Sequence, residues 1–269
     1  GLVVRVRLRG GRLSPEQAKG IAELDAQYGN GLIDLSARAN VQVRGLSDKT
    51  HGPMVDGLRG LGLTDMSTEA EARRNIVVTP FWQHGDGTSE LVRALTDALA
   101  LSDGPQTPGK FGYAVDCGPA PVLQSVSADI RIERGNGGGL IVRADGSDYG
   151  AGVTMETAAA TALELARWFM DAGGSSDGRG RMAALLARGV TLPERFATTG
   201  AIRPTNNQPA PGPSAQGFLV SFPFGQMHAS TLSDLSAFGF LRVTPWRMML
   251  IEGAAKSPEI SNLITDPHD

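Results

Sequence analysis

Cationic and amide side chains recur in residues 35–45 in a pattern that could hold an anion. Val41 and Val43 alternate with polar neighbours, which predicts a single strand through this stretch. Arg38 and Asn40 lie two positions apart, so on a strand they would share one face. A guanidinium and an amide on one face are suited to binding an anion. An edge strand with one solvated face is the simpler interpretation of the same pattern.

Further cations stand on or beside other predicted strands. Residues 2–9 alternate apolar side chains with Arg5, Arg7 and Arg9, which predicts three guanidinium groups on one strand face. Like charges on one face repel each other unless an anion or water lies against them. Arg74 precedes an apolar strand, and Lys110 opens the strand predicted at residues 110–115. The cations therefore indicate local anion sites.

The composition sets limits on what these sites can bind. The chain has 269 residues, 41% apolar and 20% charged, which suffices for a buried core and one or two domains. Its net charge is -3, with a pI of about 5.9, so it lacks the global basic field of nonspecific nucleic-acid binding. No apolar run approaches the roughly 18 residues of a membrane span. We expect a cytoplasmic protein that binds neither nucleic acid nor membrane.

Helix and strand signals alternate along the chain. Ser14 to Gln17 predicts a helix start, because an N-cap serine, a proline at the first position and a capping-box glutamine coincide. The glycine-rich residues 135–139 close a predicted hairpin and are followed by a strand pattern, which argues against a nucleotide-binding loop. Further predicted helices span residues 54–61, 89–100, 154–171, 179–188 and 232–238; further strands span 76–78, 126–133, 140–144, 218–224 and 241–253.

A faint internal repeat relates the two ends of the chain. When residues 241–253 are set under residues 35–45, Trp246 aligns with Arg38 and Met248 with Asn40. The preceding residues 218–225 align with residues 2–9. Two strand-helix-strand copies suggest half-domains related by a pseudo-twofold axis, with the middle segment as a separate layer. Chance similarity is the alternative.

Several short motifs, in the same order, resemble the sulfite and nitrite reductase superfamily, and within it the precorrin-3B synthases. The family pattern T-T-R-Q-N-x-Q-x-x-G is matched by residues 36–45, and R-x-R-x-P-G-G by residues 5–11. The family's R-N segment falls on Arg74 and Asn75, and L-P-R-K-F-K falls on residues 107–112. The resemblance runs over nearly the whole chain.

This resemblance implies an α+β fold: two ferredoxin-like half-domains related by a pseudo-twofold, with an intervening α/β sandwich domain. The expected parts are residues 1–66 for the first half-domain, 67–203 for the sandwich, 204–216 for a linker, 217–256 for the second half-domain and 257–269 for a tail. The implied ligand is a tetrapyrrole held by its carboxylates, which guanidinium groups bind as forks. The expected substrate-binding residues are Arg5, Arg7, Arg38, Asn40, Arg74 and Lys110; no catalytic residue or metal ligand is assigned.

Two departures from the reductase pattern favour the precorrin-3B synthases. The second lysine of the reductases is Gly112 here, and the asparagine pair of the second half-domain is replaced by Trp246, Arg247 and Met248. The expected activity is a monooxygenase that hydroxylates precorrin-3A and forms a lactone, with dioxygen and an electron donor as partners. A siroheme-dependent sulfite or nitrite reductase fragment is the first alternative, and a noncatalytic tetrapyrrole-binding protein is the second.

The resemblance also implies a 4Fe-4S cluster and an iron for the intact protein, and siroheme if the reductase alternative holds. The chain has one cysteine, Cys117, which excludes an intrachain disulfide and matches no cluster position. We expect the cluster cysteines to lie beyond residue 269 in a longer protein. His84 is the least unsuitable of the four histidines as an iron ligand, although an exposed loop histidine is the simpler interpretation.

Overall fold

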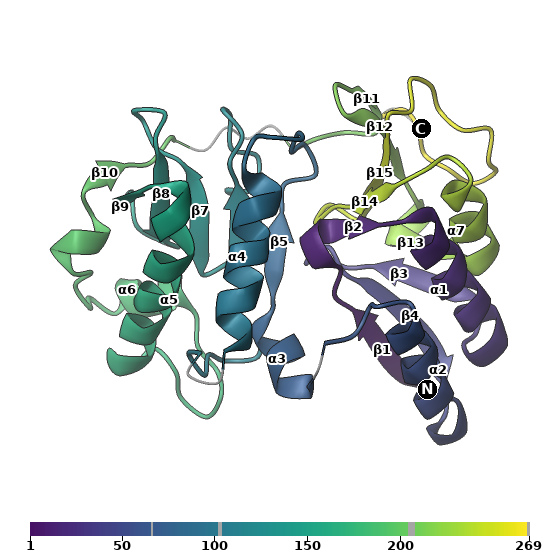
Figure 1. Cartoon of the computed structure of the whole chain (residues 1–269), viewed down its shortest axis with the longest axis horizontal. Coiled ribbons are helices and arrows are strands. Elements are labelled where there is room, and N and C mark those ends of the chain that lie inside the picture. The colour runs from purple at the N-terminus through teal and green to yellow at the C-terminus, as the bar shows by residue number, and fades with distance from the viewer. Residues whose placement is uncertain (66, 102–103, 204–207, 268–269) are drawn as a thin grey trace. The chain divides into compact units, whose positions relative to one another are not determined.

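A computed structural model describes residues 1–65, 67–101, 104–203 and 208–267 (Figure 1). The fold is α+β, and the chain divides into two compact units. Unit 1 contains Gly1–Met66 and Gln208–Asp269, and unit 2 contains Ser67–Asn207. The finer five-part division stays a prediction; within the predicted linker, residues 204–207 lie outside the described residues and Gly212–Ser214 form a strand, β11.

Unit 1 contains two antiparallel sheets. The first has the order β1-β4-β3-β13, and the second has the order β11-β12-β15-β14-β2. The strands of the first sheet are β1 (Leu2–Val6), β4 (Val41–Leu46), β3 (Leu32–Leu35) and β13 (Gln226–His228). The other strands of the second sheet are β12 (Gly217–Ser221), β15 (Met248–Glu252), β14 (Leu241–Val243) and β2 (Arg12–Leu13). The helices are α1 (Pro15–Tyr28), α2 (Asp48–Gly60) and α7 (Ala229–Ser236).

The two halves of unit 1 repeat the same arrangement and exchange one short strand each. Strand β2, from the first half, pairs with β14 in the second sheet, and β13, from the second half, pairs with β3 in the first sheet. Val6 pairs with Val41, and Val220 pairs with Met249, the residue aligned with Val41. The predicted repeat of the hairpin segments is therefore confirmed.

The earlier part of the repeat differs from the predicted alignment by two residues. The 3-10 turn Arg9–Gly11 corresponds to the turn Pro223–Gly225, so residues 2–9 do not match residues 218–225 position for position. Helix α1 has 14 residues and α7 has 8. This difference in helix length changes the spacing between the earlier and later segments, and no single offset could align both.

The prediction of one long strand through residues 35–45 and another through residues 241–253 is wrong. The chain turns at residues 36–40 between β3 and β4, and at residues 244–247 between β14 and β15. Arg38 and Asn40 therefore belong to a hairpin loop and not to one face of a strand. The alternation that predicted a strand through Arg38 comes from β4 alone, which begins at Val41.

Two further strand ends differ from the prediction. Strand β1 ends at Val6, so Arg5 lies on the strand, whereas Arg7 and Arg9 follow it. Three arginines on one strand face are thus not found. Lys110 lies in a turn, because strand β6 begins at Tyr113.

Unit 2 is a six-stranded sheet in the order β10-β9-β8-β7-β6-β5. Strands β5, β6 and β7 run parallel, and β7 to β10 are antiparallel. The strands are β5 (Ile76–Val78), β6 (Tyr113–Asp116), β7 (Ile130–Arg134), β8 (Leu140–Ala144), β9 (Tyr149–Val153) and β10 (Thr199–Gly200). The helices are α3 (Thr68–Arg73), α4 (Thr88–Ala100), α5 (Met155–Asp171) and α6 (Met182–Ala187). The predicted hairpin closed by residues 135–139 is confirmed, although β7 begins later than the strand predicted there.

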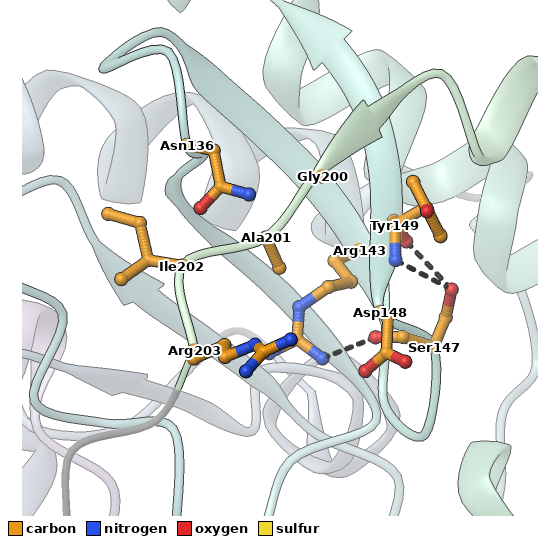
Figure 2. Close-up of a pocket in the computed structure, with 9 residues that line it drawn as sticks. All are labelled: Asn136, Arg143, Ser147, Asp148, Tyr149, Gly200, Ala201, Ile202 and Arg203. Atoms are coloured by element: carbon orange, nitrogen blue, oxygen red, sulfur yellow. Dashed lines mark hydrogen bonds between the residues drawn. The ribbon is translucent and has the colours of Figure 1, made fainter.

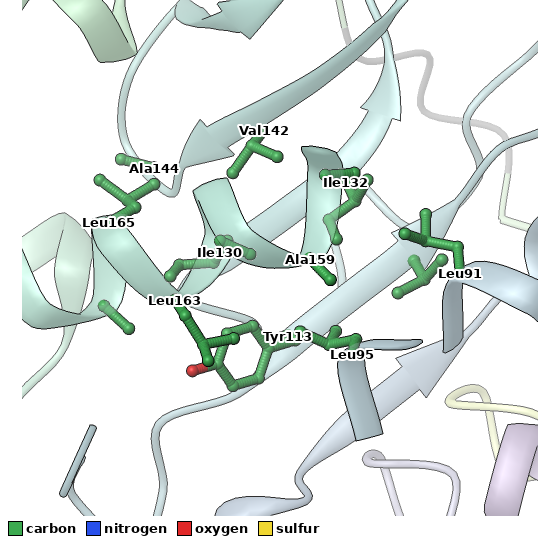
Figure 3. Close-up of a cluster of buried hydrophobic side chains, with 14 of the residues drawn as sticks. Leu91, Leu95, Tyr113, Ile130, Ile132, Val142, Ala144, Ala159, Leu163 and Leu165 are labelled. Atoms are coloured by element: carbon green, nitrogen blue, oxygen red, sulfur yellow. The ribbon is translucent and has the colours of Figure 1, made fainter. Parts of the chain in front are cut away.

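Helices α4 and α5 lie together across the sheet of unit 2 (Figure 1). Their apolar faces pack on the strands, and Figure 3 shows Leu95, Leu163 and Ile132 in this buried cluster. Tyr113 also lies in the cluster, where burial raises the pKa of its phenol far above the ordinary value. This core fixes the start of β6 and therefore the position of the turn that carries Lys110.

Candidate functional site

The loop that carries Arg38 is held by one serine hydroxyl. The Oγ of Ser36 accepts hydrogen bonds from the backbone N of Arg38 at 3.3 Å and of Asn40 at 3.1 Å. The backbone N of Ser36 donates to the carbonyl of Asn40 at 3.0 Å. Ala39 takes a left-handed backbone conformation with φ 53°. These bonds fix the backbone of a five-residue loop between β3 and β4.

The second half of unit 1 builds the same loop with different side chains. The Oγ1 of Thr244 accepts from the backbone N of Trp246 at 3.3 Å and of Met248 at 3.2 Å. The N of Thr244 donates to the carbonyl of Met248 at 3.0 Å, and Arg247 has φ 59°. Trp246 thus occupies the position of Arg38, and Met248 that of Asn40.

The two 3-10 turns lie beside these loops. A Cβ atom on Gly11 would lie 3.7 Å from the carbonyl oxygen of Val243, and one on Gly225 would lie 2.7 Å from the side chain of Arg247. The Nη1 of Arg247 also donates to the carbonyl of Phe224 at 3.4 Å. We call residues 9–11, 36–40, 223–225 and 244–248 together the twin-loop edge of unit 1.

Unit 1 brings three of its four predicted binding residues to this edge. Arg7 directly follows Val6, the last residue of β1, whose partner Val41 follows Asn40, so Arg7 lies beside the Arg38 loop. Asn40 is buried, and Arg7 and Arg38 are partly buried. Arg5 lies farther along β1 and is exposed. Arg7, Arg38 and Asn40 thus supply two guanidinium groups and an amide at this edge, and carboxylates accept hydrogen bonds from such donors.

In unit 2, the side-chain amide of Asn75 links the segment of Arg74 to the segment of Lys110, the two predicted binding residues of this unit. The Nδ2 of Asn75 donates to the carbonyl of Phe111 at 2.9 Å, and the N of Tyr113 donates to the carbonyl of Asn75 at 2.8 Å. Arg74 is buried, 5% exposed, whereas Lys110 is exposed. Asn75 therefore holds the segment of Arg74 against the segment of Lys110. Its place in the sequence did not reveal this role.

The glycine that replaces the expected second lysine is constrained by this same asparagine. A Cβ atom on Gly112 would lie 2.6 Å from the Nδ2 of Asn75 and 3.2 Å from its carbonyl oxygen. The N of Gly112 donates to the Oδ2 of Asp129 at 3.0 Å, which restrains its backbone. A lysine at position 112 would therefore displace Asn75.

A charged cluster supports the second sheet of unit 1. Glu252 accepts from Arg12 at 2.7 Å for each oxygen and from Arg242 at 2.6 Å. Burial acts to raise the pKa of Glu252, but the hydrogen bonds and charges of Arg12 and Arg242 hold that pKa below its ordinary value. The equivalent positions of the first sheet carry Asp34, which accepts from Arg44 and, at 2.8 Å, from Gln226. The same geometry thus recurs with the acid and the base exchanged.

A polar pocket of about 320 Å³ lies at the β9–β10 end of unit 2 (Figure 2). Arg143 and Arg203 extend into it, together with Asn136. The Nε of Arg143 donates to Glu133 at 2.7 Å and its Nη1 to the carbonyl of Ser147 at 2.8 Å, so this guanidinium is engaged by the protein. None of the six predicted binding residues lines this pocket.

The described residues hold no group of three or more His, Cys, Asp or Glu side chains placed to bind a metal ion. Cys117 is buried, and burial raises the pKa of its thiol to about 11. His84 is exposed, and its ring meets that of Trp82 edge-on at 5.4 Å. No helix in the described parts of the chain has the length and apolar character that crossing a membrane requires.

Comparisons with known proteins point to one superfamily. Residues 1–61 match the family described as the nitrite/sulfite reductase ferredoxin-like half domain. The chain is 29% identical to a ferredoxin–nitrite reductase of Synechococcus elongatus over 126 residues, 43% of this chain and 25% of that protein. It is 33% identical to the chloroplastic ferredoxin–nitrite reductase of Zea mays over 79 residues, 29% of this chain and 14% of that protein.

The fold is similar to that of the NirA protein of Mycobacterium tuberculosis, with a TM-score of 0.67 at 14% identity over 94% of this chain and 54% of NirA. The chain thus matches about half of that structure and at most a quarter of the curated relatives. The predicted relation to the sulfite and nitrite reductases is supported, as are the half-domain and the fold class. The narrower prediction of a precorrin-3B synthase is not supported by these comparisons.

Proposed function

We propose that the chain is the tetrapyrrole-binding part of an oxidoreductase of the siroheme-dependent nitrite and sulfite reductase type. The observation that carries the proposal is the twin-loop edge, where Arg7, Arg38 and Asn40 lie near one another within the residues that match the half-domain of that reductase family. The relatives with related sequence are named ferredoxin–nitrite reductases, which favours nitrite over other small anions.

The proposed ligand is a tetrapyrrole with several peripheral carboxylates. Arginine stays charged at any relevant pH and binds carboxylates through two parallel hydrogen bonds. The proposed contacts are Arg5, Arg7, Arg38 and Asn40 of unit 1, and Arg74 and Lys110 of unit 2. The buried surroundings of Asn40 and Arg74 strengthen charge-assisted hydrogen bonds, because they exclude competing water.

The donor set of the chain fits the periphery of siroheme but does not fit a 4Fe-4S cluster. When bound, siroheme would supply the iron at which a small anion is reduced. Of the two proposed contacts in unit 2, Lys110 is the exposed one, and its Nζ could hold that anion or give it a proton. A cluster requires several thiolates. Cys117 is the one cysteine of the chain, it is buried, and burial raises the pKa of its thiol. No step of the proposal passes through a cluster.

A precorrin-3B synthase-like monooxygenase is the second candidate, and Gly112 favours it. Reduction of nitrite or sulfite consumes protons, and the second lysine of the reductases cannot be accommodated beside Asn75. Trp246 and Met248 likewise replace polar groups at the twin-loop edge. In this candidate the tetrapyrrole is the substrate precorrin-3A, and dioxygen and an electron donor are the other reactants.

Tetrapyrrole binding by the whole chain tests both candidates. Titration with siroheme and with uroporphyrin, an octacarboxylate tetrapyrrole, is followed by the shift of the Soret band. Arg38→Ala should weaken binding about tenfold, the effect of one lost charged hydrogen bond. The matched control is Arg93→Ala, which removes an exposed arginine from α4 of unit 2 and should bind as the wild type does. Equal affinities of the two variants, or no binding at all, would refute the proposal.

Turnover by the intact protein separates the candidates. Reduction of nitrite or sulfite with a reduced ferredoxin-type donor would establish the first. Lactone formation from precorrin-3A with dioxygen would establish the second. Binding of a tetrapyrrole with neither activity would identify a noncatalytic binding protein.

A further inference from the structure

Two large side chains of the twin-loop edge have backbone conformations that suit glycine. Phe224 and Arg247 both have φ 59°. The left-handed region costs a residue with a Cβ atom free energy, because the Cβ approaches the following carbonyl oxygen. The ring of Phe224 is 94% exposed, so packing within the protein does not compensate this cost. Strain of this kind concentrates at functional sites.

The first half of unit 1 shows what these positions require structurally. The residue equivalent to Phe224 is Gly10, with φ 63°, and the residue equivalent to Arg247 is Ala39, with φ 53°. Both backbones therefore take the same shape, and a glycine or an alanine suffices to build it. The large side chains at Phe224 and Arg247 are not needed to form the turn or the loop.

The protein fixes the position of the Arg247 side chain. A Cβ on Gly225 would lie 2.7 Å from the Cβ and Cδ of Arg247, so the arginine stem packs directly over the glycine backbone. Its Nη1 donates to the carbonyl of Phe224 at 3.4 Å. Arg247 is exposed, and its guanidinium is held by the backbone carbonyl of the exposed Phe224.

We infer that Phe224 and Arg247 form a contact for the tetrapyrrole, in which the phenyl ring packs on the macrocycle and the guanidinium binds a peripheral carboxylate. A flat aromatic ligand with a rim of carboxylates matches an exposed aromatic ring and an exposed arginine on neighbouring loops. The inference rests on the proposed tetrapyrrole binding and adds specificity-determining residues from the second half-domain. Gly10 and Ala39 offer no such contact, so the two halves would recognise different parts of the ligand.

Glycine substitutions separate this role from a structural one. Phe224→Gly and Arg247→Gly keep the backbone conformation and relieve its strain, so the melting temperature should stay the same or rise. Each should weaken uroporphyrin binding about tenfold in a Soret titration of the whole chain. Asp177→Gly is the matched control: it relieves a φ of 50° in an exposed turn of unit 2 and should leave binding unchanged.

The outcomes distinguish this inference from the proposal on which it rests. If wild type binds uroporphyrin and Arg38→Ala weakens binding, but both glycine variants bind like Asp177→Gly, the inference is wrong and the proposed function stands. If wild type does not bind uroporphyrin, both the inference and the proposed function are wrong. A lower melting temperature in both glycine variants would show that the side chains stabilise the fold, and would also overturn the inference. An Arg247→Lys variant that regains part of the lost affinity would support the carboxylate contact.

Discussion

Asp25 of helix α1 is a buried carboxylate whose replacement should stabilise the protein. The residue is 0% exposed, and neither carboxylate oxygen makes a hydrogen bond within the described residues. A Cβ atom on Gly29 would lie 1.9 Å from Oδ1, so the carboxylate packs against the chain that leaves the helix. Burial raises the pKa of Asp25 from 3.8 to about 6, partly offset by the nearby N–H of Gly31.

The size of the effect follows from the shift in pKa. A rise from 3.8 to about 6 corresponds to about 3 kcal/mol, since one pKa unit is worth about 1.4 kcal/mol. The folded state retains a proton that the unfolded chain releases, so this group stabilises the fold less as pH rises. The loss begins near the unfolded pKa, about 4, and is complete above the folded pKa, at about pH 7.

The Asp25→Asn variant cannot lose this proton. Its free energy of unfolding relative to wild type should therefore rise by up to about 3 kcal/mol between about pH 4 and pH 7, and then stay level. Urea unfolding of both proteins, followed by circular dichroism across this range, measures the difference. Glu23→Gln on the same helix is the control, because Glu23 is 67% exposed; its difference from wild type should stay nearly flat. A pH-independent difference for Asp25→Asn would refute the reasoning.

Two further predictions concern other buried groups. Glu252→Gln should lower the free energy of unfolding by about 3 kcal/mol in urea titrations, because Arg242, 5% exposed, loses its carboxylate partner. The corresponding change in the first sheet, Asp34→Asn, removes the partner of the half-exposed Arg44 and should lower the free energy of unfolding by about 1 kcal/mol or less. Equal losses in the two variants would show that burial of the arginine does not set the cost. Cys117, with a thiol pKa of about 11, should react with iodoacetamide at about pH 8 at least about a hundredfold more slowly in the folded chain than in urea. Comparable rates in the two states would show that the thiol is accessible and ionised.

Local signals in the sequence predicted helices α1 and α5 well, because the residues that make them are adjacent. Helix α2 begins at Asp48, ahead of the predicted residue 54, and α3 was not predicted. Ser14 and Gln17 form the predicted capping box, with bonds of 3.2 and 3.1 Å, and α5 follows Thr154 as its apolar spacing indicates. The parts of the site that depend on a loop were mispredicted. The hydroxyl of Ser36 holds a loop at a place where the sequence continues the alternation of β4, and periodicity alone does not distinguish a loop from a longer strand.

The exchanged strands β2 and β13 were not predictable from local sequence. Each has only two or three residues, too few to show an alternation, and each pairs with a strand from the other end of the chain. Their stability comes from those distant partners. The close approach of Gly225 to Arg247, which shapes the twin-loop edge, joins a turn and a loop of the second half and is equally hidden in the sequence.

The exchanged charges explain why the internal repeat is faint in sequence although its geometry is well preserved. Asp34 and Arg44 occupy the positions of Arg242 and Glu252, so an alignment scores each pair as a mismatch, whereas in the structure each pair joins two neighbouring strands. An ion pair stabilises two strands equally well in either direction, because the attraction does not depend on which strand carries the acid. Ser36 and Thr244 likewise hold equivalent loops with the same hydroxyl chemistry. The halves differ in chemistry at Arg38 against Trp246 and at Gly10 against Phe224, which are positions that the proposed tetrapyrrole binding involves.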